Sequence, residues 1–198
     1  MRSVEPLPMD HIEHDPQLAE IFAERLTRTG YISNSLRVMA RVPGLVRSAD
    51  TLVTEMFFRG EVETPLKMLM FLMFSGGWGC HYCQAHALVN VKKAGVEDDQ
   101  LDALWEFPDS DRFDAREKAA LSLARDAVSP DGVTEDHYRQ LRKHFDDDQI
   151  IELLGMIATA AFLNTWNSSL GTELEPYPLE AATETLGHLG WTGERHRK

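Results

Sequence analysis

The sequence predicts an all-α protein, and three observations support this fold class. Apolar residues recur at helical spacing along most of the 198 residues. Alternating apolar and polar segments, which are typical of half-buried strands, are absent from the sequence. Glycine and proline fall between the helical stretches, whereas in an all-β chain turn residues recur roughly every eight to twelve positions.

The first part of the chain predicts three helices. Asp15-Pro16 provides a start for the first helix, whose apolar face carries Leu18, Ile21, Phe22 and Leu26. Residues 31–40 indicate a short helix that begins near Ser33 or Asn34. Pro43 then begins a helix with apolar residues at helical spacing, namely Leu45, Val46, Ala49, Leu52, Val53, Met56 and Phe57.

The central part predicts two helices separated by glycines. Thr64-Pro65 places a hydroxyl cap before a proline, which is a strong start signal. Residues 66–74 are apolar on nearly every side, so this helix is expected to be buried. We expect Gly76, Gly77 and Gly79 to end it. The next helix begins at or just before Cys80 and ends near residue 93 or 94, before Gly95.

Shorter helices are expected in the second half. Asp98 or Asp99 begins one that reaches Trp105, Asp111 or Asp114 begins another through Ala127, and Thr134 begins a third. Residues 150–168 form the last long helix. Pro176 and Pro178 lead us to expect an extended arm with one weak helical turn after Gly171.

Composition limits the possible roles of the chain. We expect one domain over residues 1–198, with its core at about 20–175 and a C-terminal arm at about 172–198. A net charge of −12 and a pI near 5.0 disfavour nucleic-acid and anionic-membrane partners. Neither a signal peptide nor an apolar run of about 18 residues is present, so we expect a cytoplasmic protein.

Cys80 and Cys83 are the only cysteines, and their spacing places them about 60° apart on one helix face. Cys80 stands at a helix start, where unpaired N–H groups favour a thiolate and lower the pKa of a thiol. His86 lies about 60° beyond Cys83 and is expected to serve as its base or cationic partner. The spacing favours a redox dithiol; two structural cysteines, or a zinc site with His86, are the alternatives.

Residues 79–86 (GCHYCQAH), followed by KKAGV at 92–96, resemble the alkylhydroperoxidase D-like (AhpD-like) group of the carboxymuconolactone decarboxylase superfamily. Residues 31–35, 43–45, 101–107 and 162–167 extend the likeness to a peroxidase-related branch. The resemblance implies an AhpD-like helical bundle that assembles as a dimer, trimer or hexamer. It implies no cofactor or metal.

The resemblance also implies reduction of a hydroperoxide at the dithiol, with a separate thiol compound as reductant. Cys83 would be the peroxidatic cysteine that becomes a sulfenic acid, and Cys80 would close the disulfide. His86 would transfer protons. The helix N-terminus and His86 both favour the thiolate of Cys83, so Cys83 is expected to be more reactive than a free thiol. The remaining readings are a non-catalytic redox sensor and a decarboxylase or lyase that uses His86.

The better-studied peroxidases of this group carry a glutamate twelve residues before the first cysteine, where this chain has Met68. They also place the histidine one residue later, at the position of Ala87. Because the relay carboxylate is missing, slow turnover is expected, and Met68→Glu is expected to raise it.

A second set of polar residues is expected to face the cysteines. Asn164, Trp166 and Asn167 follow the apolar part of the long helix, and Ser75 ends the buried one. These residues are candidates for substrate binding, although helix capping and core packing would also explain them. Glu152 is a candidate buried carboxylate on the long helix.

Overall fold

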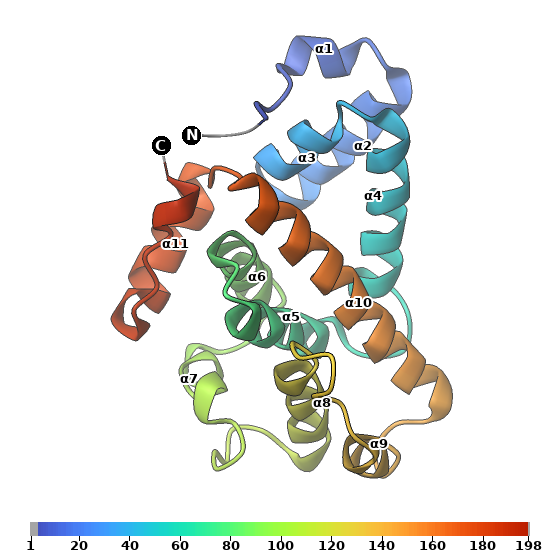
Figure 1. The fold of residues 1–198 in the computed structure, drawn as a ribbon, viewed down its shortest axis with the longest axis vertical. Coiled ribbons are helices and arrows are strands. Elements are labelled where there is room, and N and C mark those ends of the chain that lie inside the picture. The colour runs from blue at the N-terminus through green and yellow to red at the C-terminus, as the bar shows by residue number, and fades with distance from the viewer. Residues whose placement is uncertain (1–3, 198) are drawn as a thin grey trace.

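The computed structural model describes residues 4–197, and in this range the chain folds into helices and loops without a strand. Helices α5 (Thr64–Trp78) and α6 (His81–Lys93) lie side by side at the centre. The other helices surround this pair (Figure 1), with α8 (Ala115–Asp126) against α5 and α11 (Pro176–Leu186) against α6. The predicted all-α fold class is confirmed, whereas the oligomeric state stays a prediction.

The N-terminal helices form a second layer with its own small core. Helices α2 (Pro16–Thr29), α3 (Asn34–Met39) and α4 (Pro43–Phe58) begin close to the expected residues. The Asp15 carboxylate accepts hydrogen bonds from the first turn of α2, and the Ser33 hydroxyl does the same for α3. A short helix, α1 (Met9–Glu13), was not predicted; it buries Ile12 against α2.

The predicted glycine break is only partly correct. Helix α5 continues through Gly76 and Gly77 and ends at Gly79, which takes the left-handed conformation with φ 77°. The two helical glycines are needed for close packing: a Cβ at Gly76 would lie 2.5 Å from Trp105, and one at Gly77 would lie 2.9 Å from Val128. They therefore allow neighbouring elements to approach α5.

The second half supplies α7 (Asp98–Asp102), a 3-10 turn η1 (Leu104–Glu106), α8, α9 (Glu135–Leu141) and α10 (Asp147–Leu170). Asp114 and Asp146 form capping boxes at the starts of α8 and α10. Helix α10 is long and apolar enough to cross a membrane by length and composition alone. It packs against α4, α5 and α6.

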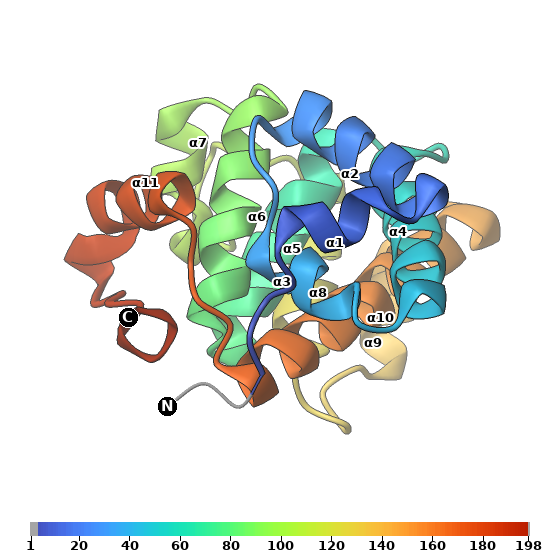
Figure 2. The same ribbon diagram turned by 90° about the horizontal axis from the view of Figure 1, so that it is seen from above.

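The expected extended C-terminal arm is wrong. Residues Pro176–Leu186 form α11, followed by the 3-10 turns η2 (Gly187–Leu189) and η3 (Glu194–His196). Both prolines lie within the first three positions of α11, where a missing N–H breaks no helical hydrogen bond. Figure 2 shows α11 beside α6, so this segment covers the helix that carries the cysteines.

Glu152 joins α10 to α5 through an ion pair. Its carboxylate pairs with the ammonium of Lys67, a side chain with no exposed surface, and accepts backbone N–H groups from Glu61 and Val62. The lysine also donates to the carbonyl of Arg59. The carboxylate of Glu152 therefore has a structural role, because it anchors the loop between α4 and α5 to α10.

Candidate functional site

The two cysteines lie at the N-terminus of α6, in the middle of the fold. Cys80 is the N-cap residue, and its Sγ accepts the backbone N–H of Cys83 at 3.4 Å. Both cysteines are free thiols and are buried. The turn between Gly79 and α6 therefore brings the two sulfurs together within the first turn of the helix.

The two thiols differ strongly in acidity. Hydrogen bonding from Cys83, followed by bonds from Ser168 and backbone N–H groups, outweighs burial and lowers the pKa of Cys80 to about 7. Burial, followed by the contact with Cys80, raises the pKa of Cys83 well above its usual value. The sequence predicted that the helix start and His86 favour a thiolate at Cys83, but burial and the neighbouring Cys80 raise its pKa, so Cys80 is the more acidic of the two thiols. The greater reactivity expected of Cys83 stays a prediction.

We expect the reduced protein to show one thiolate that titrates near pH 7. Below that pH both sulfurs are protonated, and above it Cys80 is ionised while Cys83 is not. The ultraviolet absorbance of the thiolate measures this titration. Cys83→Ala should move the midpoint upward because it removes the largest stabilising hydrogen bond. A midpoint near 9, the usual value for a thiol, in both proteins would contradict the assignment.

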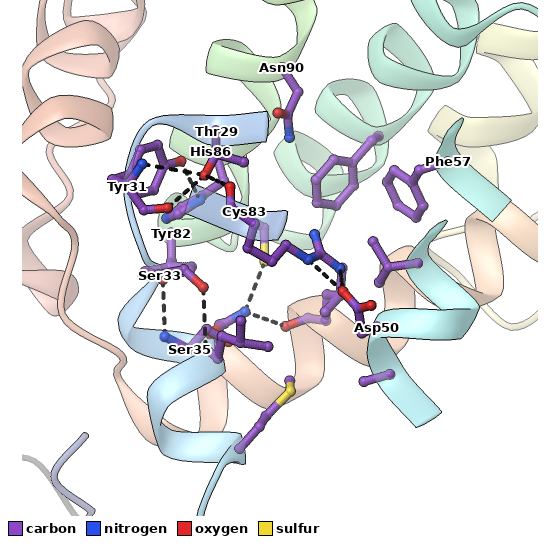
Figure 3. A pocket seen from close by; sticks show the side chains of 18 of the residues that line it. Thr29, Tyr31, Ser33, Ser35, Asp50, Phe57, Tyr82, Cys83, His86 and Asn90 are labelled. Atoms are coloured by element: carbon purple, nitrogen blue, oxygen red, sulfur yellow. Dashed lines mark hydrogen bonds and ion pairs between the residues drawn. The ribbon is translucent and has the colours of Figure 1, made fainter. Parts of the chain in front are cut away.

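A cavity of about 130 Å³ opens beside Cys83. Figure 3 shows Tyr31, Tyr82 and His86 on one side and Phe57 on the other, with Cys83 between them. The wall is largely apolar and aromatic, and also includes Leu36, Met39, Ala49, Val53, Phe58, Phe71 and Leu163. An ion pair of 2.6 Å between Arg25 and Asp50 contributes the charged part. The space fits a small, mostly apolar molecule.

His86 lies between a tyrosine and a carboxylate. Its Nε2 is 2.7 Å from Oε2 of Glu175, and its Nδ1 is 3.0 Å from the hydroxyl of Tyr31. Burial alone would raise the pKa of Glu175, but the charge and hydrogen bond of His86, with backbone N–H groups, make the net shift downward. An ionised carboxylate can only accept, so Nε2 of His86 carries a proton.

Glu175 is held from several directions. Tyr82 donates its hydroxyl to Oε1 of Glu175 at 2.9 Å, and the backbone N–H of Asn34 donates to the same oxygen. The Tyr82 hydroxyl also accepts the backbone N–H of Ser35 at 3.3 Å. Residues from α3 and α6 thus fix the buried carboxylate of Glu175, the N-cap residue of α11, behind the histidine.

The direct partnership of His86 with Cys83 expected from helical spacing is not the geometry observed. Both side chains line the cavity, but the two ring nitrogens of His86 face Tyr31 and Glu175. The 60° spacing placed the histidine on the correct face. It could not show that residues from two distant segments would occupy both nitrogens.

Of the four residues expected to form a substrate pocket, Asn167 lines the cavity and donates its Nδ2 to Cys83 Sγ at 3.6 Å. Asn164 is fully buried and donates to Ser75 Oγ at 3.1 Å, and neither residue lines this cavity. Trp166 packs with the N-terminal helices instead. Three of these four residues therefore lie outside the cavity wall.

Sequence reasoning missed Glu175 and the role of Tyr31. Glu175 precedes two prolines in a segment that was expected to be an extended arm, so nothing nearby marked it as buried. Its only sequence signal is its place before Pro176 at a helix start. Within residues 4–197, no group of three or more His, Cys, Asp or Glu side chains is arranged to hold a metal ion.

The chain is similar to several known proteins, although no family model matches it. The debrominase Bmp8 superimposes with a TM-score of 0.84 at 27% identity, covering 92% of this chain and 97% of Bmp8. A Bmp8 variant with one cysteine replaced by alanine, in complex with 2,3,4-tribromopyrrole, gives a TM-score of 0.85 at 26% identity over 93% and 98% of the two chains.

Two further likenesses are weaker in sequence. An AhpD-core, peroxidase-related protein from Ralstonia eutropha JMP134 matches with a TM-score of 0.76 at 15% identity, over 90% of this chain and 96% of its own. The uncharacterized protein YdfG of Bacillus subtilis (strain 168) is 26% identical over 91 residues, or 45% of this chain. The match spans 60% of the length of YdfG.

The helical fold is similar to that of the AhpD-like proteins of known structure. The predicted resemblance to the AhpD-like group is confirmed at the level of the fold. The solved relatives include both peroxidase-related proteins and a debrominase, so the fold leaves more than one chemistry open.

Proposed function

We propose that this protein is a thiol-dependent reductase that transfers two electrons from the Cys80/Cys83 dithiol to a small hydroperoxide. The observation that carries the proposal is that Cys83 lines an aromatic cavity while its partner Cys80, outside that cavity wall, has a lowered pKa. One sulfur is placed to meet a substrate, and the other is ready to act as a nucleophile behind it.

The proposed reaction balances without a cofactor. Cys83 passes its proton to Cys80, and the Cys83 thiolate attacks the terminal oxygen of the hydroperoxide. The O–O bond breaks, an S–OH forms, and the alkoxide takes up a proton to leave as an alcohol. The Cys80 sulfur, deprotonated again, then attacks Cys83, the S–O bond breaks with loss of water, and a disulfide forms. An external thiol or dithiol compound returns two electrons.

Asn167 supports the first step. Its amide N–H donates to the sulfur of Cys83 and lowers the pKa of that thiol, against the effect of burial. Because Cys83 is buried and much of the wall is apolar, a thiolate formed there is poorly solvated and reactive toward an electrophile. This reading assigns Asn167 a catalytic contact rather than the substrate-binding role expected from sequence.

Reductive dehalogenation is the second candidate. Bmp8 is named a debrominase, and its cysteine variant holds a bromopyrrole. The same dithiol would serve here: the Cys83 sulfur takes the bromine, the ring carbon takes a proton, and Cys80 displaces bromide as the disulfide closes. The aromatic wall formed by Phe57, Phe58 and Phe71 suits a flat ring.

Parallel assays with the reduced protein distinguish these possibilities. Cumene hydroperoxide and 2,3,4-tribromopyrrole are each mixed with the wild-type protein and with Cys83→Ser, in the presence of a dithiol reductant. Turnover of the hydroperoxide supports the proposal, and release of bromide alone selects the second candidate. If neither compound is turned over but a disulfide forms, the protein is a redox sensor. If neither compound produces a disulfide, the cysteines have no redox role, and a lyase that uses His86 is the remaining possibility.

Cys80 and Cys83 are expected to form a reversible intramolecular disulfide. This expectation follows from their one-turn spacing and from the contact between the Cys80 sulfur and the first turn of α6. Intact-protein mass spectrometry after mild oxidation should show the loss of two protons, and a dithiol reductant should restore the original mass. Two unmodified thiols after treatment with excess peroxide would count against this expectation.

A further inference from the structure

We propose that Tyr31 is the general acid of the reaction, protonating the group that leaves when Cys83 attacks, with Glu175 as the residue that positions His86 behind it. This inference rests on the proposed function. It names the source of a proton that both candidate chemistries require, on the alkoxide oxygen or on the ring carbon. It also explains how the site works without a carboxylate at Met68.

Tyr31 is the member of the network that can reach a substrate. It lines the same cavity as Cys83, whereas Glu175 does not. The hydroxyl of Tyr82, which also lies near the cavity, is committed to Glu175 as donor and to Ser35 as acceptor. Among residues 4–197, the hydroxyl of Tyr31 has one hydrogen-bond partner, the Nδ1 atom of His86.

The partners of His86 set the direction of proton transfer. Glu175 accepts from Nε2, which leaves Nδ1 to exchange a proton with the Tyr31 hydroxyl. When the imidazole is protonated, Nδ1–H donates to the tyrosine oxygen and the O–H of Tyr31 is free to point into the cavity. The leaving alkoxide then takes the hydroxyl proton, and the tyrosine oxygen takes the proton from Nδ1. Tyrosine is restored, and His86 ends neutral.

The buried carboxylate makes this arrangement stable. The side chains of His86 and Glu175 are only 15% and 8% exposed, so their ion pair is little screened by solvent. The ring of Tyr82 stacks on that of His86 with centroids 4.4 Å apart, which restricts rotation of the imidazole. A fixed imidazole keeps Nδ1 aimed at Tyr31.

The dependence of the rate on the leaving group tests this role. Reduction of an alkyl hydroperoxide expels an alkoxide, a strong base whose basicity is close to that of hydroxide, so it needs a proton. Reduction of peracetic acid expels acetate, a carboxylate with a conjugate-acid pKa of about 4, which leaves without one. A general acid therefore matters for the first substrate and not for the second.

Tyr31→Phe keeps the ring and removes the hydroxyl. We expect its rate of oxidation by cumene hydroperoxide to fall about 10²-fold, within the range for general acid catalysis, while its rate with peracetic acid changes little. Tyr177→Phe is the matched control, since this neighbouring tyrosine is 52% exposed and lies outside the cavity wall. Loss of thiols in a single turnover is the measured quantity.

Glu175→Gln tests the positioning role. It should reproduce the same selective loss, and the double variant with Tyr31→Phe should lose little more than either single variant, because both act through one chain of hydrogen bonds. Equal losses with both oxidants, additive losses, or no loss in Tyr31→Phe would overturn the inference while leaving the proposed function intact. A wild-type protein that reacts with neither oxidant would overturn both.

Discussion

Cys83→Ser is expected to abolish turnover, lowering the rate on the order of 10³-fold or more, as the loss of a catalytic nucleophile does. Cys83 is the cysteine that lines the cavity, and a serine hydroxyl there lacks both the nucleophilicity and the redox chemistry of a thiol. The measurement is consumption of the hydroperoxide by reduced protein in the presence of a dithiol reductant.

Cys80→Ser provides the matched control, because it removes the other sulfur at the same helix terminus. That variant keeps the cavity thiol but cannot close the disulfide. It should consume no more than one equivalent of hydroperoxide, slowly, because it also lacks the thiolate that accepts the proton of Cys83. Sustained turnover by Cys83→Ser, or full activity of Cys80→Ser, would reverse or refute the assigned roles.

Met68→Glu is expected to destabilise the protein by about 3–5 kcal/mol, the range for an uncompensated buried charge. Met68 has no exposed surface and lies within the apolar core of α5. The substitution should not raise the reduction rate, because Glu175 already occupies Nε2 of His86. The sequence alone led us to expect a gain in activity, because the relay carboxylate was taken to be absent. With Glu175 beside His86, we no longer expect that gain.

Urea denaturation measures the loss of stability. We expect a lower midpoint urea concentration and an unchanged dependence of the unfolding free energy on urea concentration. Met68→Leu is the control, since a volume-conserving apolar exchange usually costs less than about 1.5 kcal/mol. A Met68→Glu protein that folds with wild-type stability and reduces hydroperoxide faster would show that Glu175 does not serve the histidine.

The sequence predicted the fold where local physics decides it. The start of α5 at Thr64-Pro65 and the burial of the apolar stretch that follows were both correct, although Glu63 is the N-cap residue and the Thr64 hydroxyl is not the cap. The prediction that Gly76 and Gly77 end the helix was wrong. Both lie within α5, and they are small because Trp105 and Val128 approach the helix there from distant segments. Helix α11 was missed because proline was taken as a helix breaker, although at a helix start it costs no hydrogen bond.

In the candidate site, too, the features set by local sequence were predicted and those set by tertiary contacts were not. Cys80, Cys83 and His86 could be placed on one helix terminus from their spacing, since all three lie within two turns. Their chemistry depends on tertiary contacts that spacing does not contain: Glu175 lies 89 residues from His86, and Tyr31 lies 55 residues away. The lowered pKa of Cys80 was predicted correctly from its place at the helix start, whereas that of Cys83 was misjudged for a related reason, because its complete burial raises the pKa.

The central claim is that the dithiol donates two electrons to a substrate bound beside Cys83. A single-turnover titration tests it most directly: reduced wild-type protein receives increasing amounts of cumene hydroperoxide without added reductant, and free thiols and cumyl alcohol are counted. We expect one alcohol to form for every two thiols lost, with the Cys80–Cys83 disulfide as the protein product. Formation of alcohol without loss of thiols, or loss of thiols without alcohol, would contradict it.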